Sequence, residues 1–153
     1  MSNSWQEAYG RLQDFITANP GIEVRNDITV ILGDVRPEFY RLFDDVRITL
    51  LKEKCGALIK EAEILSENYI KAEQEVTQLL KLENISMMVP LQRFLHNPVN
   101  ELIKDLWGPL FDLLKGRIDQ EFFERKGTRN VEITSRGLVR LGYAKWVALS
   151  LVK

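Results

Sequence analysis

Six basic side chains lie close together near the C-terminal end of the sequence, and they are the residues with the clearest potential chemistry. They are Arg125, Lys126, Arg129, Arg136, Arg140 and Lys145, and a single acid, Glu132, falls among them. Arginine and lysine contact phosphate oxygens, so this cluster could bind nucleic acid with a salt-dependent, sequence-independent affinity. The alternative is a solvated surface, or a patch that docks on an acidic helix, which is the more common role of a run of like charges.

The remaining candidates for catalytic or metal chemistry are weak. The one histidine, His96, has no acid or cysteine close to it in sequence, and the acids Asp44 and Asp45 are neighbours that point in different directions on a helix. The phosphate-binding, nucleophile and metal-binding motifs that can be recognised from short spacings do not occur in the sequence. We therefore predict no cofactor and no metal, and an enzyme is the least favoured of the functions considered.

Composition and charge are those of an ordinary globular protein. The chain has 153 residues, of which 45% are hydrophobic and 28% charged, and its formal net charge is −1. This charge gives no global attraction to nucleic acid or to a membrane. No apolar run approaches the roughly 18 residues that span a bilayer, and the first residues do not resemble a signal peptide. We expect a cytoplasmic protein that does not contact membranes.

These side chains must be positioned by helices, and one predicted helix dominates the sequence. Pro37 suits a first helical turn, and the next proline is Pro90. Between them, apolar residues recur alternately every three and four positions, which predicts a helix over about 37–84 with a coiled-coil-like seam. The seam comprises Ile48, Leu51, Cys55, Leu58, Ala62, Leu65, Tyr69, Ala72, Val76 and Leu79.

The seam allows two interpretations. Its small residues, Cys55, Ala62 and Ala72, and the apolar residues beside it favour the core of an intramolecular helical bundle. A helix that also dimerises is the sharper alternative. The residues predicted to carry such an interface are Ile48, Leu51, Leu58, Leu65, Tyr69 and Val76.

A small β element is expected beside the helices. Residues 22–32 are rich in β-branched side chains around the turn signal Asn26-Asp27, and residues 131–133 form the other candidate strand. A second long helix is predicted over 98–126, interrupted near Pro109 and ended by Gly127. A last helix is predicted to begin at Thr134 or Ser135.

The sequence thus predicts a mainly α fold: a single helical domain over 1–153, organised on one very long helix. The apolar C-terminal segment leaves two alternatives open: a last helix docked on this core, or a domain that is the N-terminal part of a longer chain. The expected function is protein–protein interaction or scaffolding, with a second copy or another protein as partner. Nucleic-acid binding through residues 125–145 is the alternative, and an enzyme of unspecified type is the third.

Overall fold

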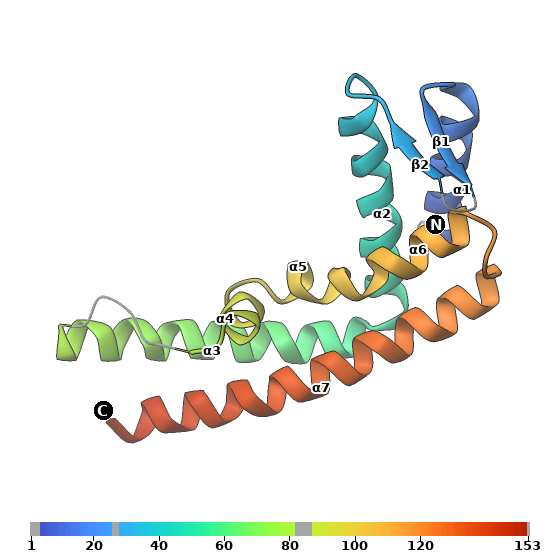
Figure 1. Ribbon diagram of the computed structural model, residues 1–153. Coiled ribbons are helices and arrows are strands. Elements are labelled where there is room, and N and C mark those ends of the chain that lie inside the picture. Colours follow the sequence, from blue (N-terminus) through green and yellow to red (C-terminus); the bar gives the residue numbers. More distant parts are fainter. Residues whose placement is uncertain (1–3, 26–27, 82–86, 153) are drawn as a thin grey trace. The chain divides into compact units, whose positions relative to one another are not determined.

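The computed structural model describes residues 4–25, 28–81 and 87–152, and it confirms a mainly α fold with a small antiparallel sheet (Figure 1). Contacts between residues divide the chain into two compact units. The first contains residues 1–55 and 105–130, and the second contains residues 56–104 and 131–153. Each unit therefore combines an earlier and a later stretch of the sequence.

In the first unit, α1 (Trp5–Ala18) packs on α2 (Arg36–Lys54), together with α6 (Trp107–Leu114) and the beginning of α7. Ser4 caps α1 by accepting a hydrogen bond from the backbone N–H of Glu7, which satisfies one of the unpaired donors of the first turn. Aromatic rings fill much of the core, and the centroids of Phe43 and Phe111 lie 4.7 Å apart. The fully buried side chains of this unit include Trp5, Leu12, Phe39, Phe43, Val46 and Phe123.

The predicted β element is an antiparallel hairpin of the first unit, formed by β1 (Ile22–Arg25) and β2 (Ile28–Ile31). Ile22 pairs with Ile31, and both side chains are buried. Alternation along the strands places Ile28 and Val30 on the other face, where they are exposed. The predicted turn residues Asn26 and Asp27 lie outside the described residues. The hairpin packs against the helical core through β1 and α6. An isolated two-stranded hairpin is only marginally stable, so this packing stabilises it.

The single helix expected over 37–84 is instead two helices, α2 and α3 (Gly56–Leu80), separated at Cys55; residues 82–84 of the prediction lie outside the described residues. The backbone N–H of Cys55 still donates to the carbonyl of Leu51 at 2.8 Å, but its φ and ψ of −124° and 25° leave the helical region. Gly56 follows at once, and glycine is among the poorest helix formers. The seam periodicity continues across this break, which is why periodicity alone did not reveal it.

The second unit contains α3, α4 (Val89–His96), α5 (Pro98–Leu102) and the later part of α7. Helix α3 packs on α4 and α5, and the buried hydroxyl of Ser66 donates to the carbonyl of Leu95. A Cβ atom added to Gly142 of α7 would lie 2.8 Å from the Cδ2 of Leu65 and 2.9 Å from that of Leu95. Close packing of α7 against this core therefore leaves little room for a side chain at position 142.

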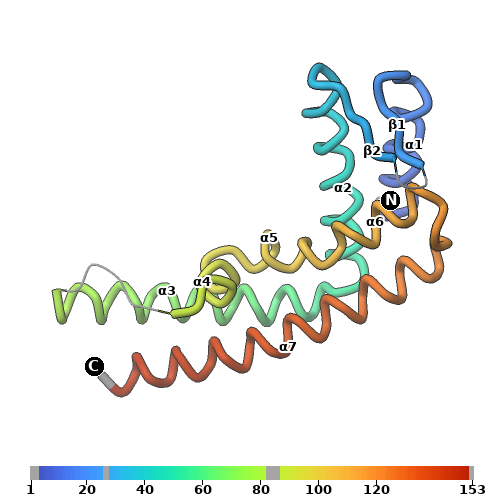
Figure 2. Tube along the Cα trace, in the orientation of Figure 1, coloured from blue at the N-terminus to red at the C-terminus, as the bar shows by residue number. Residues whose placement is uncertain are grey.

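Residues 131–133 do not form a strand, and this part of the prediction is wrong. They lie within α7 (Gln120–Val152), a continuous helix of 33 residues that the tube in Figure 2 follows to its end. Val131 is buried and Ile133 exposed, as expected for residues two positions apart on a helix.

Gly127 does not end a helix either, because it lies inside α7. A Cβ added there would lie 2.7 Å from the Cδ2 of Leu106, so Gly127 serves close packing in the first unit. The helix predicted over 98–126 is divided into α5, the short 3-10 helix η1 (Ile103–Leu106), α6 and the beginning of α7.

Candidate interaction surface

The later part of α7 has one buried side and one exposed side. Ser135, Gly142 and Leu149 are buried and recur every seven residues, so they lie on one face of the helix. Val131 and Val139 are also buried. The residues at these positions set the orientation of α7 in the second unit, and they determine which of its side chains reach the surface.

The opposite side of this helix exposes apolar side chains. The spacing of residues 133, 137, 140, 144, 147 and 151 alternates between four and three, which places all six on one stripe. The three large apolar members are strongly exposed: Ile133 by 62%, Val147 by 54% and Leu151 by 82%. The remaining members are Gly137, Arg140 and Ala144. We call these six residues the α7 stripe.

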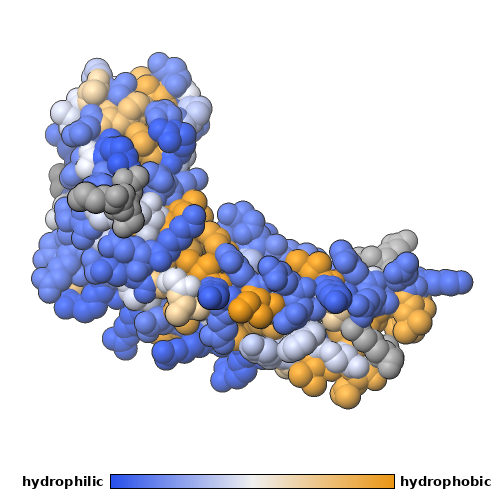
Figure 3. Space-filling view, turned by 180° about the vertical axis from the view of Figure 1, so that it is seen from behind, coloured by the Kyte–Doolittle hydropathy of each residue, from blue (hydrophilic) through white to orange (hydrophobic). Residues whose placement is uncertain are grey.

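The borders of the α7 stripe add further apolar surface. Leu141 and Tyr143 are exposed by 41% and 38%, and the ring of Tyr143 lies 5.9 Å from that of Trp146. A Cβ added to Gly137 would meet nothing within 4 Å, so the helix backbone is open to an approaching chain at that position. The space-filling view shows hydrophobic side chains at the molecular surface among hydrophilic ones (Figure 3). Exposed apolar patches of this kind mark contact surfaces more often than chance.

The six basic residues predicted as a nucleic-acid contact are all exposed, but they do not belong to one unit. Arg125, Lys126 and Arg129 lie in the first unit, and Arg136, Arg140 and Lys145 lie in the second. In the first unit, the Arg125 and Lys126 cations lie 5.6 and 5.8 Å from the ring centroid of Phe122. In the second unit, Arg136 and Arg140 are four residues apart and share a helix face, whereas Lys145 points elsewhere.

The seam residues predicted as an interface lie mostly in the interior of the chain. Leu51, Leu65, Tyr69 and Val76 are buried, and Ile48 and Leu58 are half-buried. Burial raises the pKa of the Tyr69 hydroxyl, and the neighbouring carboxylate of Glu73 raises it further. Use of the seam between two chains stays a prediction, and in this conformation the four buried residues would first have to be uncovered.

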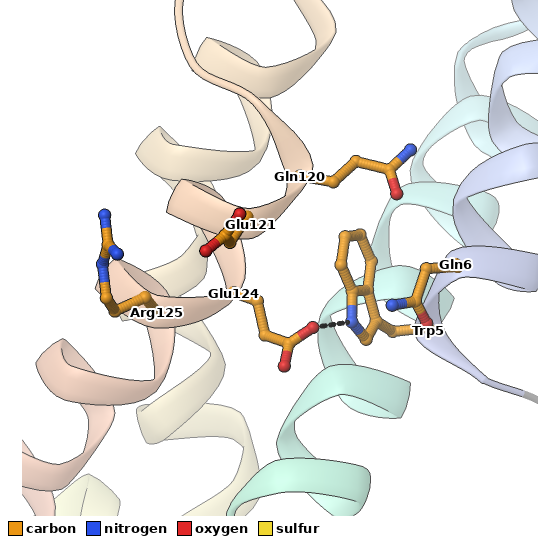
Figure 4. A pocket seen from close by; sticks show the side chains of 6 residues that line it. All are labelled: Trp5, Gln6, Gln120, Glu121, Glu124 and Arg125. Carbon is orange, nitrogen blue, oxygen red and sulfur yellow. Dashed lines mark hydrogen bonds between the residues drawn. The ribbon is translucent and has the colours of Figure 1, made fainter.

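In the first unit, Trp5 is one of six residues that line a surface pocket of about 410 Å³ (Figure 4). The indole N–H of Trp5 donates to the Oε2 of Glu124 at 2.9 Å, and the backbone N–H of Trp5 donates to the Oε2 of Glu53 at the same distance. Lys54 forms an ion pair of 3.1 Å with the Oε1 of Glu124. These interactions use both N–H groups of Trp5 and the carboxylate of Glu124. Arg125 points away from the indole.

His96 has an acidic neighbour that its sequence context did not reveal. The Nε2 of His96 lies 3.3 Å from the Oε1 of Glu73, which precedes it by 23 residues, and its Nδ1 lies 2.7 Å from the carbonyl oxygen of Gln92. The contact between Nε2 and Glu73 joins α4 to α3, whereas Nδ1 contacts a carbonyl of its own helix, α4.

The α7 stripe was not predicted as a surface from the sequence. The signal was present, because the alternating spacing of Ile133, Gly137, Ala144, Val147 and Leu151 can be seen in the sequence. It was obscured by the strand assigned to 131–133 and by the apolar residues on the buried side of the same helix. Only the burial of α7 distinguishes the two faces.

Three comparisons with known proteins add no assignment. No family model, no curated protein and no solved structure matches the chain. In the described part of the chain, no three His, Cys, Asp or Glu side chains gather closely enough to hold a metal ion. None of the described helices is both long and apolar enough to cross a membrane.

Proposed function

We propose that this chain is a protein–protein interaction module that associates with copies of itself through the α7 stripe. The observation that carries the proposal is the exposure of Ile133, Val147 and Leu151 on the side of α7 opposite its buried residues. Alternating spacing of four and three is the pattern by which helices pair along a seam. Gly137 and Ala144 lie between the large residues and allow a second helix to approach closely.

The proposal keeps the interaction role predicted from the sequence but moves the contact to another helix. The seam of α2 and α3 is largely covered by the chain itself, whereas the α7 stripe has the same periodicity and an uncovered apolar face. Burial of apolar surface stabilises association by about 25 cal/mol per Å² before the entropic costs of binding are subtracted. Three large side chains exposed by more than half are therefore a substantial contribution.

The solution mass over a wide concentration range, measured by light scattering after size exclusion, tests the proposal. We expect a concentration-dependent dimer for the natural chain and a monomer for Val147→Glu, because the glutamate would place a charge in the seam. Leu79→Glu is the matched control, since it makes the same kind of change at an exposed leucine of α3. A chain that stays monomeric at all concentrations, or a Leu79→Glu variant as defective as Val147→Glu, would contradict the proposal.

A second function, nucleic-acid binding, is favoured by one specific observation. Arg129, Arg136, Arg140 and Lys145 are exposed, and in the part of the chain that the structure describes they form no ion pair. Their cations are thus free to contact phosphate oxygens. The division of the cluster between two units makes this the weaker proposal.

A further inference from the structure

We infer that the partner of the α7 stripe is the same stripe of a second copy, running antiparallel about a two-fold axis at position 142. This inference rests on the proposed function and specifies its geometry. A two-fold axis makes a contact isologous, so that each residue i faces a residue j and each j faces an i. An antiparallel contact of this kind therefore requires the α7 stripe to be complementary to the same stripe in reversed direction.

Reversal of the α7 stripe pairs a large residue with a small one at its four central positions. With the axis at 142, paired positions add up to 284, which gives the pairs 133 with 151, 137 with 147, and 140 with 144. Gly137 then faces Val147, and Ala144 faces Arg140. Ile133 faces Leu151 at both ends, where the two large apolar side chains pack against each other. Knobs that fill holes in this way are the geometry of paired helices.

A parallel, in-register pair would lack this complementarity. Each residue would face its own copy, so Gly137 would face Gly137 and Ala144 would face Ala144, leaving gaps. Arg140 would face Arg140, with two guanidinium groups at the same level. In the antiparallel pair, the two Arg140 residues are offset by four residues, or about 6 Å along the axis. Size and charge therefore both favour the antiparallel arrangement.

The antiparallel arrangement also provides a place for the Arg140 side chain. The small Ala144 of the second copy leaves room for its aliphatic stem, while the guanidinium extends toward water at the border of the seam. Tyr143 lies at that border, next to Ala144, and is exposed by 38%. An arginine over a tyrosine ring is a favourable cation–π contact. The single charge within the stripe thus has a neighbour that accommodates it.

Site-specific cross-linking distinguishes the two orientations. Chains carrying Gly137→Cys and chains carrying Val147→Cys are prepared separately, one with a tag that changes its mass, and treated with a thiol cross-linker shorter than about 10 Å. In the antiparallel pair, positions 137 and 147 are opposed, whereas each position lies about 15 Å along the axis from its own copy. Position 137 has free space for a side chain, and the natural Cys55 is buried.

The expected result is a cross-linked dimer in the mixture of the two chains and little in either chain alone, with at least about a fivefold difference in yield. Cross-linking of each chain with itself would overturn the antiparallel orientation and leave the α7 stripe as the contact. A dimer by light scattering without either product would place the contact elsewhere, and a monomer would overturn both the inference and the proposed function. Unmodified chain, with Cys55 alone, controls for background reaction.

An independent test uses the one charge in the stripe. In the antiparallel pair, Arg140→Leu places an apolar side chain opposite Ala144 and removes a like-charge repulsion, so the dimer dissociation constant should fall about tenfold. The natural dimer should also strengthen as salt is added, because salt screens the two arginines. Weaker association of Arg140→Leu, or a dimer that dissociates in salt, would count against this arrangement.

Discussion

The indole nitrogen of Trp5 and the carboxylate of Glu124 are joined by a hydrogen bond of 2.9 Å across 119 residues of sequence. The same carboxylate forms an ion pair with Lys54 at the end of α2. One residue of α7 therefore connects the first turn of α1 with the last turn of α2. The Trp5 side chain is completely buried, and its ring centroid lies 5.1 Å from that of Phe123. This contact helps to close the first unit around its aromatic core.

The first prediction concerns pH. The hydrogen bond from Trp5, followed by the interactions with Lys54, lowers the pKa of Glu124 below its ordinary value. A carboxyl whose pKa is lower in the folded state stabilises the fold above its unfolded pKa of about 4.3, and this contribution is lost as the pH falls through the folded pKa. We expect the free energy of unfolding of the natural chain to decrease more steeply below pH 5 than that of Glu124→Gln. Urea titrations between pH 3 and 7 measure this difference.

Trp5→Phe separates the hydrogen bond from the charge. Phenylalanine keeps an aromatic ring but cannot donate, so the carboxylate of Glu124 loses its main stabilising partner and its pKa should rise. The loss of a hydrogen bond to a charged group costs about 1.5–3 kcal/mol, and the smaller ring adds a packing cost. NMR titration of the Glu124 side chain follows the pKa directly. An unchanged titration midpoint in Trp5→Phe would show that the bond does not set it.

The second prediction concerns the seam of α3. Leu65 is completely buried, whereas Leu79, two heptads further along the same helix, is exposed by 62%. Leu65→Ala should lower the free energy of unfolding by about 2–5 kcal/mol, and Leu79→Ala should change it by less than about 0.5 kcal/mol. Equilibrium denaturation gives both values. If Leu65→Ala instead leaves stability intact and lowers the solution mass, the seam is an interface between chains.

The third prediction compares two glycines of α7. Alanine is favoured over glycine in a helix by about 1 kcal/mol, so Gly137→Ala, which meets open space, should raise the free energy of unfolding by about that amount. Gly142→Ala places its Cβ against the methyl groups of Leu65 and Leu95, both completely buried. Overpacking costs about 1–3 kcal/mol, which should cancel or reverse the gain. Denaturation at protein concentrations low enough to keep the chain monomeric compares the two. Equal gains at both positions would show that α7 is not held closely at Gly142.

Particular residues show how far the sequence determined this fold. Periodicity predicted the helical class, and β-branched residues around a turn signal predicted the hairpin of Ile22 to Ile31. The sequence could not show that Gly127 and Gly142 allow close packing. A glycine that ends a helix and a glycine that lets another element approach look alike in sequence. Nor could it separate the two faces of α7, since Val139 and Val147 are equally apolar and only their burial differs. The partners of Trp5 and His96 lie far away in sequence and depend on tertiary structure.

The fourth prediction tests nucleic-acid binding. If Arg136 and Arg140 contact phosphates, a labelled DNA duplex should bind with an affinity that falls as salt rises. Arg136→Glu with Arg140→Glu should remove this binding, because it replaces two attractive charges by two repulsive ones. Lys60→Glu with Lys71→Glu is the matched control, since it makes the same change in net charge at exposed lysines of α3 in the same unit.

Salt distinguishes this function from self-association, although Arg140 takes part in both. Binding to phosphate weakens with salt, whereas pairing of two α7 stripes should strengthen, because there the arginines repel each other.

Val147→Glu leaves Arg136 and Arg140 in place while it disrupts the stripe. Fluorescence anisotropy of the labelled duplex with this variant therefore reveals whether the basic residues act without the dimer. If the control pair and the Arg136→Glu, Arg140→Glu pair lose binding equally, net charge alone is responsible and residues 125–145 form no specific contact. If only the arginine pair loses it, and Val147→Glu does not, the basic residues bind nucleic acid independently of the pairing of two α7 stripes.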